Sequence, residues 1–147
     1  MRSKAYFLRC PLPFIFILTL ILFPASAFSA TIHVPADQPT IQAGIDAASA
    51  GDVVLVADGT YTGTGNKELD FGGKAITVRS ESGPANTIID CEGDGRGFSF
   101  HSGEGQDSVV SGFTITNGKG GHGGGVYCYD SSPTITNCII KDNSTQY

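Results

Sequence analysis

Polar and aromatic side chains that could bind a sugar recur at equivalent places in two stretches 28 residues apart. Ser99 and His101 alternate with apolar residues in the first stretch, and Tyr127 and Tyr129 do so in the second. On neighbouring strands of one sheet these side chains face solvent, with Asp130 beside them. Aromatic faces stack on sugar rings, and polar groups hydrogen-bond to sugar hydroxyls. The pattern therefore predicts a glycan-binding surface at His101, Tyr127, Tyr129 and Asp130, unless the tyrosines pack beneath a neighbouring loop.

A second group of candidate ligands is the acidic turn at residues 90–95. Asp90, Glu92 and Asp94, followed by Gly95, match positions 1, 3, 5 and 6 of a calcium-binding loop, where alternate residues supply oxygens. The twelfth position needs a bidentate acid but is His101, and no flanking helices are expected. Two interpretations remain for Asp90, Glu92 and Asp94: a weak calcium site, or a solvated turn between coils. The sequence favours the solvated turn. No other cofactor is expected.

Motifs of hydrolytic enzymes are present only in fragments. Gln106-Asp107-Ser108-Val109 contains an acid, but a lone carboxylate without partners cannot carry out acid–base catalysis. His122-Gly123-Gly124-Gly125 spells the oxyanion loop of some esterases, yet the chain has no Gly-x-Ser-x-Gly nucleophile. The histidines show no zinc spacing with the cysteines. We expect no catalytic residue in this segment.

The elements that must position these groups are short strands in a repeated pattern. Residues 97–102 align with 125–130 at an offset of 28, and residues 110–115 align with 135–140 at an offset of 25. Further strands are expected at 53–56, 75–79 and 87–91. Parallel strands without helical crossovers require the chain to wind into stacked coils, so the sequence predicts an all-β parallel β-helix of about three full coils. An antiparallel sandwich is the alternative, but it gives no reason for the long repeat.

The same pattern predicts the core and one helix. The alternation places apolar side chains of the two repeats inside the coils, namely Phe98, Phe100, Phe113, Ile115, Val126, Cys128, Cys138 and Ile140. The helix spans 38–49, with Asp37 or Thr40 as its N-cap and with Ile41 and Ile45 on one face. We expect this helix to cap the N-terminal end of the solenoid, where the core and a strand edge would otherwise be open.

Residues 1–29 have the features of a secretory signal peptide. Arg2, Lys4 and Arg9 precede an apolar run at 12–23 that is too short to span a bilayer comfortably, and small residues follow. An uncleaved N-terminal anchor is the alternative. The chain carries 14 acidic and 9 basic residues for a net charge of −5, and signal removal makes the rest more acidic. A nucleic-acid partner is therefore not expected. We expect an extracellular, cell-surface or periplasmic protein with no membrane span after cleavage.

Several segments carry a resemblance to a known superfamily. Thr31-Ile32-His33-Val34-Pro35, Pro39-Thr40-Ile41-Gln42 and Gly51-Asp52-Val53-Val54-Leu55-Val56 resemble the entry to pectin-lyase-like β-helix proteins. Residues 73–78, 111–115 and 132–140 are similar to the repeats of secreted bacterial right-handed parallel β-helix proteins. The resemblance implies a right-handed coil, and it indicates no single activity because the superfamily holds lyases, esterases, hydrolases and adhesins.

Two functions remain as expectations for residues 30–147. The first is a secreted or cell-surface β-helix domain that binds polysaccharides, surface glycans or other surface partners without catalysis. The second is the N-terminal part of a polysaccharide lyase, carbohydrate esterase or glycoside hydrolase whose active site lies on coils beyond Tyr147. Residues 143–147 directly follow a repeat and form no polar cap, so we expect a C-terminal truncation or self-association at an open edge.

Overall fold

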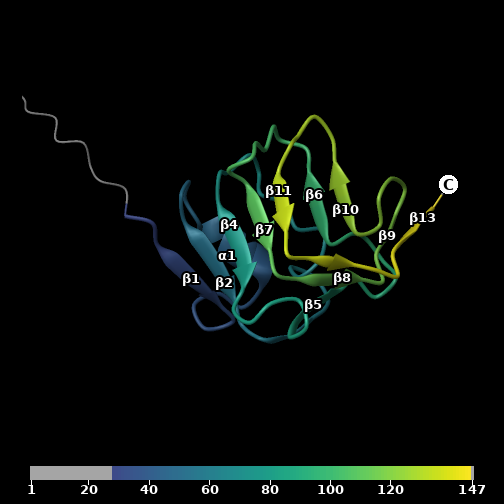
Figure 1. Cartoon of the computed structure of the whole chain (residues 1–147), viewed down its shortest axis with the longest axis horizontal. Helices are drawn as coiled ribbons and strands as arrows, with labels where there is room; N and C mark the ends of the chain where they lie inside the picture. The colour runs from purple at the N-terminus through teal and green to yellow at the C-terminus, as the bar shows by residue number, and fades with distance from the viewer. Residues whose placement is uncertain (1–27, 147) are drawn as a thin grey trace, which may run out of the picture.

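The computed structural model describes residues 28–146. The predicted signal peptide, residues 1–29, lies outside these residues except for its last two positions. The described chain winds into a parallel β-solenoid of about five turns with one short helix (Figure 1). Its coils stack from β1 at one end to β11, β12 and β13 at the other.

Four ladders of hydrogen-bonded strands build the solenoid, and every strand pair is parallel. One sheet contains, in spatial order, β1 (Thr31–Val34), β2 (Val53–Val56), β4 (Thr77–Ser80), β7 (Val109–Ser111) and β11 (Thr134–Thr136). A second contains β3 (Gly59–Tyr61), β5 (Thr87–Asp90), β8 (Thr114–Thr116) and β12 (Ile139–Ile140). The remaining ladders pair β6 (Phe98–Phe100) with β10 (Val126–Cys128), and β9 (Lys119–Gly120) with β13 (Ser144–Thr145). This topology excludes the antiparallel sandwich.

The strand register confirms both predicted repeats. Tyr127 pairs with Ser99 across β10 and β6, and Ile135 pairs with Val110 across β11 and β7. The predicted number of coils was too low, because the structure has about five turns rather than three. The first coils, which bring Thr31 beside Val53, have lengths and apolar patterns that differ from those of the later repeats. Pattern matching between repeats therefore missed them.

The core is a column of inward-facing apolar side chains in which aromatic rings meet between coils. The rings of Phe71 and Phe100 pack edge to face with centroids 5.1 Å apart, and Phe98 contacts Phe113 at 6.2 Å. Such offset aromatic pairs stabilise a core beyond the apolar area they bury. Each coil thus buries its inward side chains mainly against the coils before and after it.

The residues predicted to point inward differ in burial between coils. Four of them are fully buried: Phe98, Phe100, Phe113 and Ile115. In the next coil Val126 and Cys138 are half-buried, whereas Cys128 and Ile140 are exposed, although they pair in register with the buried Phe100 and Ile115. Within the described residues, β10 and β12 pair with a neighbour on one side only, so no further coil covers these side chains.

The only helix in the described part of the chain is α1 (Ile41–Ala47), shorter than the predicted span of 38–49. Its N-cap is Thr40, whose hydroxyl accepts a hydrogen bond from the Ala43 amide at 3.2 Å. Ile41 and Ile45 are buried, and the helix lies against β1 and β2. The amphipathic pattern therefore placed the helix correctly and overestimated its length.

Residues with left-handed backbone mark one corner of successive coils. Glu92, Asn117 and Asp142 follow β5, β8 and β12 at intervals of 25 residues, with φ angles of 57°, 57° and 55°. Asparagine and aspartate visit this conformation more readily than most residues. The repeat is thus maintained by its turns as well as by its strands.

Candidate functional site

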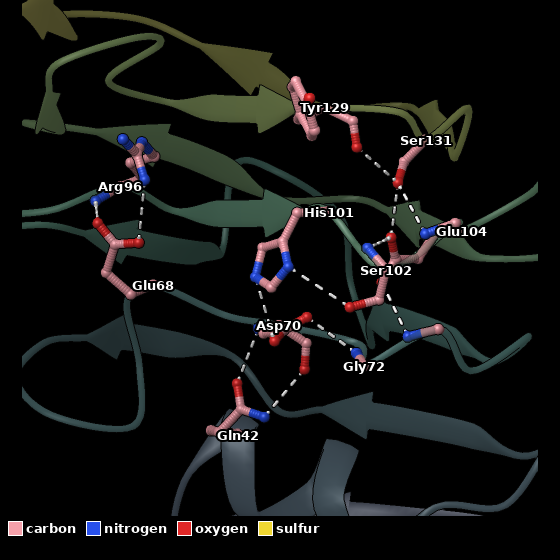
Figure 2. Close-up of polar contacts among 12 residues, drawn as sticks. Gln42, Glu68, Asp70, Gly72, Arg96, His101, Ser102, Glu104, Tyr129 and Ser131 are labelled. Atoms are coloured by element: carbon pink, nitrogen blue, oxygen red, sulfur yellow. Dashed lines mark hydrogen bonds and ion pairs between the residues drawn. The ribbon is translucent and has the colours of Figure 1, made fainter.

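The predicted glycan surface lies on the outer side of the β6–β10 ladder and at its strand ends (Figure 2). His101 directly follows β6 and Tyr129 directly follows β10, so their register places them on adjacent coils. The Tyr129 amide donates to the Phe100 carbonyl at 2.8 Å, which continues the ladder past the last paired residues. Tyr129 is 65% exposed, a large value for an aromatic residue, and the His101 side chain is about half exposed.

An aspartate of the preceding coil lies beside the imidazole of His101. The His101 Nε2 lies 3.4 Å from Asp70 Oδ2, while Asp70 Oδ1 accepts a hydrogen bond from the Gly72 amide at 2.8 Å. Gln42 of α1 fixes the backbone of Asp70, because its side chain accepts from the Asp70 amide at 2.9 Å and donates to the Asp70 carbonyl at 3.0 Å. The sequence analysis missed Asp70 and Gln42, which lie in earlier coils without a recognisable repeat.

Tyr127 lies among neighbouring side chains rather than standing free. The Arg96 guanidinium lies 4.8 Å from the centre of its ring, and the His122 ring stacks beside it with centroids 6.4 Å apart. Arg96 is itself held by Glu68, with a backbone hydrogen bond of 2.8 Å and an ion pair of 3.6 Å. For Tyr127 the structure therefore agrees with the alternative of packing against a loop.

Two more residues of this surface differ in their environment. Asp130 is exposed and leaves the strand with a left-handed φ of 49°. Ser99, which the alternation placed in solvent, is only 6% exposed. Its short side chain lies in register with the larger Tyr127 of the next coil, which accounts for its burial. The accessible part of the predicted surface thus consists of His101, Tyr129 and Asp130.

A buried carboxylate lies behind this surface. Glu104 is 2% exposed, and its Oε1 accepts a hydrogen bond from the Gly73 amide at 2.9 Å. Its Oε2 accepts from the Ser102 amide at 2.9 Å and from the Ser131 hydroxyl at 2.8 Å (Figure 2). One carboxylate therefore connects three successive coils. The acid lies in the segment between the two aligned repeats, where the sequence pattern gives no reason to bury it.

The hydrogen bonds determine the ionisation of Glu104. Burial by itself raises the pKa of this carboxyl. Hydrogen bonds from the amides of Gly73, Ser102 and Glu104 and from the Ser131 hydroxyl outweigh burial and lower the pKa below its ordinary value. Glu104 is therefore an ionised, well-satisfied acid at neutral pH.

The order Ser102, His101, Asp70 resembles a nucleophile–base–acid relay. Ser102 Oγ lies 3.4 Å from His101 Nδ1, and His101 lies 3.4 Å from Asp70, distances that are long for hydrogen bonds. Such a relay also needs amides that are free to bind an oxyanion. The nearby amides of residues 72, 73, 102 and 103 already donate to Asp70, Glu104 and Ser131. These four amides are therefore not free to bind an oxyanion beside Ser102.

The acidic turn proposed for calcium is organised around a lysine. The Lys67 ammonium lies 3.4 Å from Glu92 Oε2 and 3.6 Å from Asp94 Oδ2, and it donates to the Cys91 carbonyl at 3.3 Å. Asp90 instead accepts hydrogen bonds from Asn117 and from the Glu92 amide, both at 2.9 Å. The three carboxylates therefore do not converge on one point, and residues 28–146 contain no group of three or more acidic, histidine or cysteine side chains arranged for a metal.

An open groove of about 740 Å³ lies over the outer side of the second sheet. Its lining includes the apolar residues Pro84, Ala85, Ile88 and Ile139 together with polar residues such as Lys141. No sequence pattern marks this groove, because its lining comes from four coils whose outward residues share no motif.

Comparisons with known proteins give no relative: no family model, curated protein or solved structure matches this chain. In residues 28–146 no helix has the length and apolar character needed to cross a membrane.

Proposed function

We propose that this chain is a secreted or cell-surface right-handed β-helix domain of the pectin-lyase-like kind, which binds neutral glycans without catalysis in this segment. The observation that carries the proposal is the exposed Tyr129 ring beside the oriented His101–Asp70 pair. A sugar ring has an apolar face that stacks on an aromatic ring and hydroxyls that bond to imidazole and carboxylate groups. The exposed Asp130 adds a further acceptor at the same strand end.

Charge favours a neutral ligand over an acidic one. Asp70 and Asp130 lie at the surface, and the nearest arginine, Arg96, is already paired with Glu68 and packed on Tyr127. The chain as a whole has a net charge of −5. An acidic polysaccharide would meet repulsion from these carboxylates.

The finer features of the fold belong to the same proposal. Connections between parallel neighbours in one sheet are right-handed in about 98% of cases, and each link along the sheet β1–β2–β4–β7–β11 is such a connection. Ile41 and Ile45 of α1 are buried beside β1 and β2, as expected of a helix that covers the N-terminal end of the core. The apolar leader supports export.

The test is titration of the purified chain with cellohexaose, xylohexaose and mannohexaose. Tyr129→Ala should weaken binding of the hexasaccharide that binds by about tenfold or more, as expected of a central aromatic contact. Tyr129→Phe keeps the ring and should retain most of the affinity. His101→Ala should weaken binding, whereas His33→Ala is the matched control, since His33 is an exposed histidine on β1. Absence of binding to all three sugars, or unchanged affinity of Tyr129→Ala, would refute the proposal.

A further inference from the structure

We propose that Glu104 is the positioning residue of the binding surface and that its protonation in acid loosens the strand ends carrying His101 and Tyr129. An effect of Glu104 on glycan binding rests on the proposed function. Its effect on the positions of the strand ends does not. Glu104 touches neither His101 nor Tyr129 in the described contacts; it acts on the residues beside them (Figure 2).

The contacts of Glu104 reach both sides of the surface. Its Oε2 accepts from the amide of Ser102, the residue after His101, at 2.9 Å. The same oxygen accepts from the hydroxyl of Ser131, two residues after Tyr129, at 2.8 Å. Oε1 accepts from the Gly73 amide of the preceding coil at 2.9 Å. The ionised carboxylate therefore fixes the ends of β6 and β10 relative to each other and to the coil that supplies Asp70.

The Ser131 hydroxyl has two acceptors within reach but only one proton. Its oxygen lies 2.8 Å from Glu104 Oε2 and 3.1 Å from the Tyr129 carbonyl, and it accepts from the Gly103 amide at 3.2 Å. A charged acceptor forms the stronger hydrogen bond, so the proton points to Glu104 when this acid is ionised. When Glu104 is protonated, the hydroxyl turns to the Tyr129 carbonyl and the charged hydrogen bond between the coils is lost. The weaker bond from the Gly103 amide to Ser131 and the backbone bond from the Ser132 amide to the Glu104 carbonyl remain, so the strand ends loosen without separating.

The direction of the pH response follows from the lowered pKa of Glu104. The hydrogen bonds to the Glu104 carboxylate are complete at neutral pH. They are lost as the pH falls through a value below the ordinary pKa of a glutamate, 4.5. Other groups on the adjoining segments also carry or change charge and must be distinguished from it: Asp70, Lys74, His101, Asp107, Cys128 and Asp130. Of these, Cys128 senses the Glu104 charge, because burial and then Glu104 raise the pKa of its thiol.

The first experiment uses the isotope-labelled chain without any ligand and follows amide resonances by NMR from neutral pH to about pH 3. We expect Gly73, Ser102 and Tyr129 to shift together with one midpoint below 4.5. In Glu104→Gln this common transition should vanish. At neutral pH the exchange of the Gly73 and Ser102 amides should accelerate by about ten- to hundredfold, as expected when hydrogen bonds to a charge are lost. Glu81→Gln, at an exposed glutamate, is the control and should behave like the wild type.

A second variant separates positioning from general loss of structure. Ser131→Ala leaves the Glu104 bonds to Gly73 and Ser102 in place and removes the hydroxyl that contacts Glu104, the Gly103 amide and the Tyr129 carbonyl. It should keep the acid transition at Gly73 and Ser102 and lose it at Tyr129. Independent midpoints in the wild type, or a transition at Tyr129 that survives in both variants, would overturn the inference. Failure of all three sugars to bind would refute only the proposed function.

Discussion

The buried hydroxyl of Thr87 makes a sharp prediction about stability. Thr87 is the first residue of β5 and is 0% exposed, and its Oγ1 finds no hydrogen-bond partner within residues 28–146. A buried polar group without a partner costs about 1–3 kcal/mol. Thr87→Val keeps the shape of the side chain and replaces the hydroxyl by a methyl group. We therefore expect the free energy of unfolding to rise by about 1 kcal/mol or more.

Thr114 provides the matched control one coil further on. It begins β8 and is 6% exposed, but its hydroxyl donates to the Pro84 carbonyl at 2.7 Å. Thr114→Val loses this bond and should lower the free energy of unfolding by about 1 kcal/mol. The two isosteric substitutions should thus have effects of opposite sign.

The assay is urea unfolding at neutral pH, followed by circular dichroism, with thermal melts in parallel. For a chain of this size, a change of 1 kcal/mol moves the melting temperature by about 3–6 °C. A destabilised or unchanged Thr87→Val would refute the reasoning, because it would mean that the hydroxyl is satisfied in the folded protein. A change in the slope of the urea transition would show instead that the coils no longer unfold together.

Three further predictions concern charge and reactivity. Because the pKa of Glu104 is lowered, its stabilising contribution is complete above pH 4.5 and is lost as the pH falls through the lowered pKa. The urea midpoint of the wild type should therefore fall more steeply in acid than that of Glu104→Gln. Iodoacetamide should label the exposed Cys128 before Cys91, because burial is the main cause that raises the pKa of Cys91 to about 11; mass spectrometry of timed digests measures the order. Millimolar calcium should leave the melting temperature unchanged, because the Lys67 ammonium lies between Glu92 and Asp94, and Asp90 is hydrogen-bonded elsewhere; a calcium-dependent rise would contradict this.

The sequence predicted the repeated part of the fold better than the rest. The pairing of Tyr127 with Ser99 and of Ile135 with Val110 followed from aligned apolar positions, because each coil must place its apolar residues over those of the coil before. The early coils were missed because β1, β2 and β4 are linked by segments of unequal length, one of which contains α1. The strand register can be predicted where two coils have similar sequences. The total number of coils also depends on strand pairs whose sequences are not similar.

The site was predicted in part for a related reason. Alternation along β6 and β10 correctly separated His101 from Phe100, but it could not show that Arg96 and His122 pack on Tyr127. The alternation also could not predict the burial of Glu104, because a carboxylate can be buried only where hydrogen-bond donors such as the Gly73 and Ser102 amides surround it. These donors come from three different coils, and no spacing rule connects them.

The left-handed residues Glu92, Asn117 and Asp142 also mark a structural repeat of constant length along the solenoid. They recur every 25 residues while neighbouring strands remain one hydrogen-bond spacing apart, so each such unit lengthens the rod by about 4.8 Å. Duplication of residues 118–142 would insert one rung without changing the contacts inside any other coil. Each added copy of this turn would therefore move the two ends of the described solenoid apart by the spacing of one strand, about 4.8 Å.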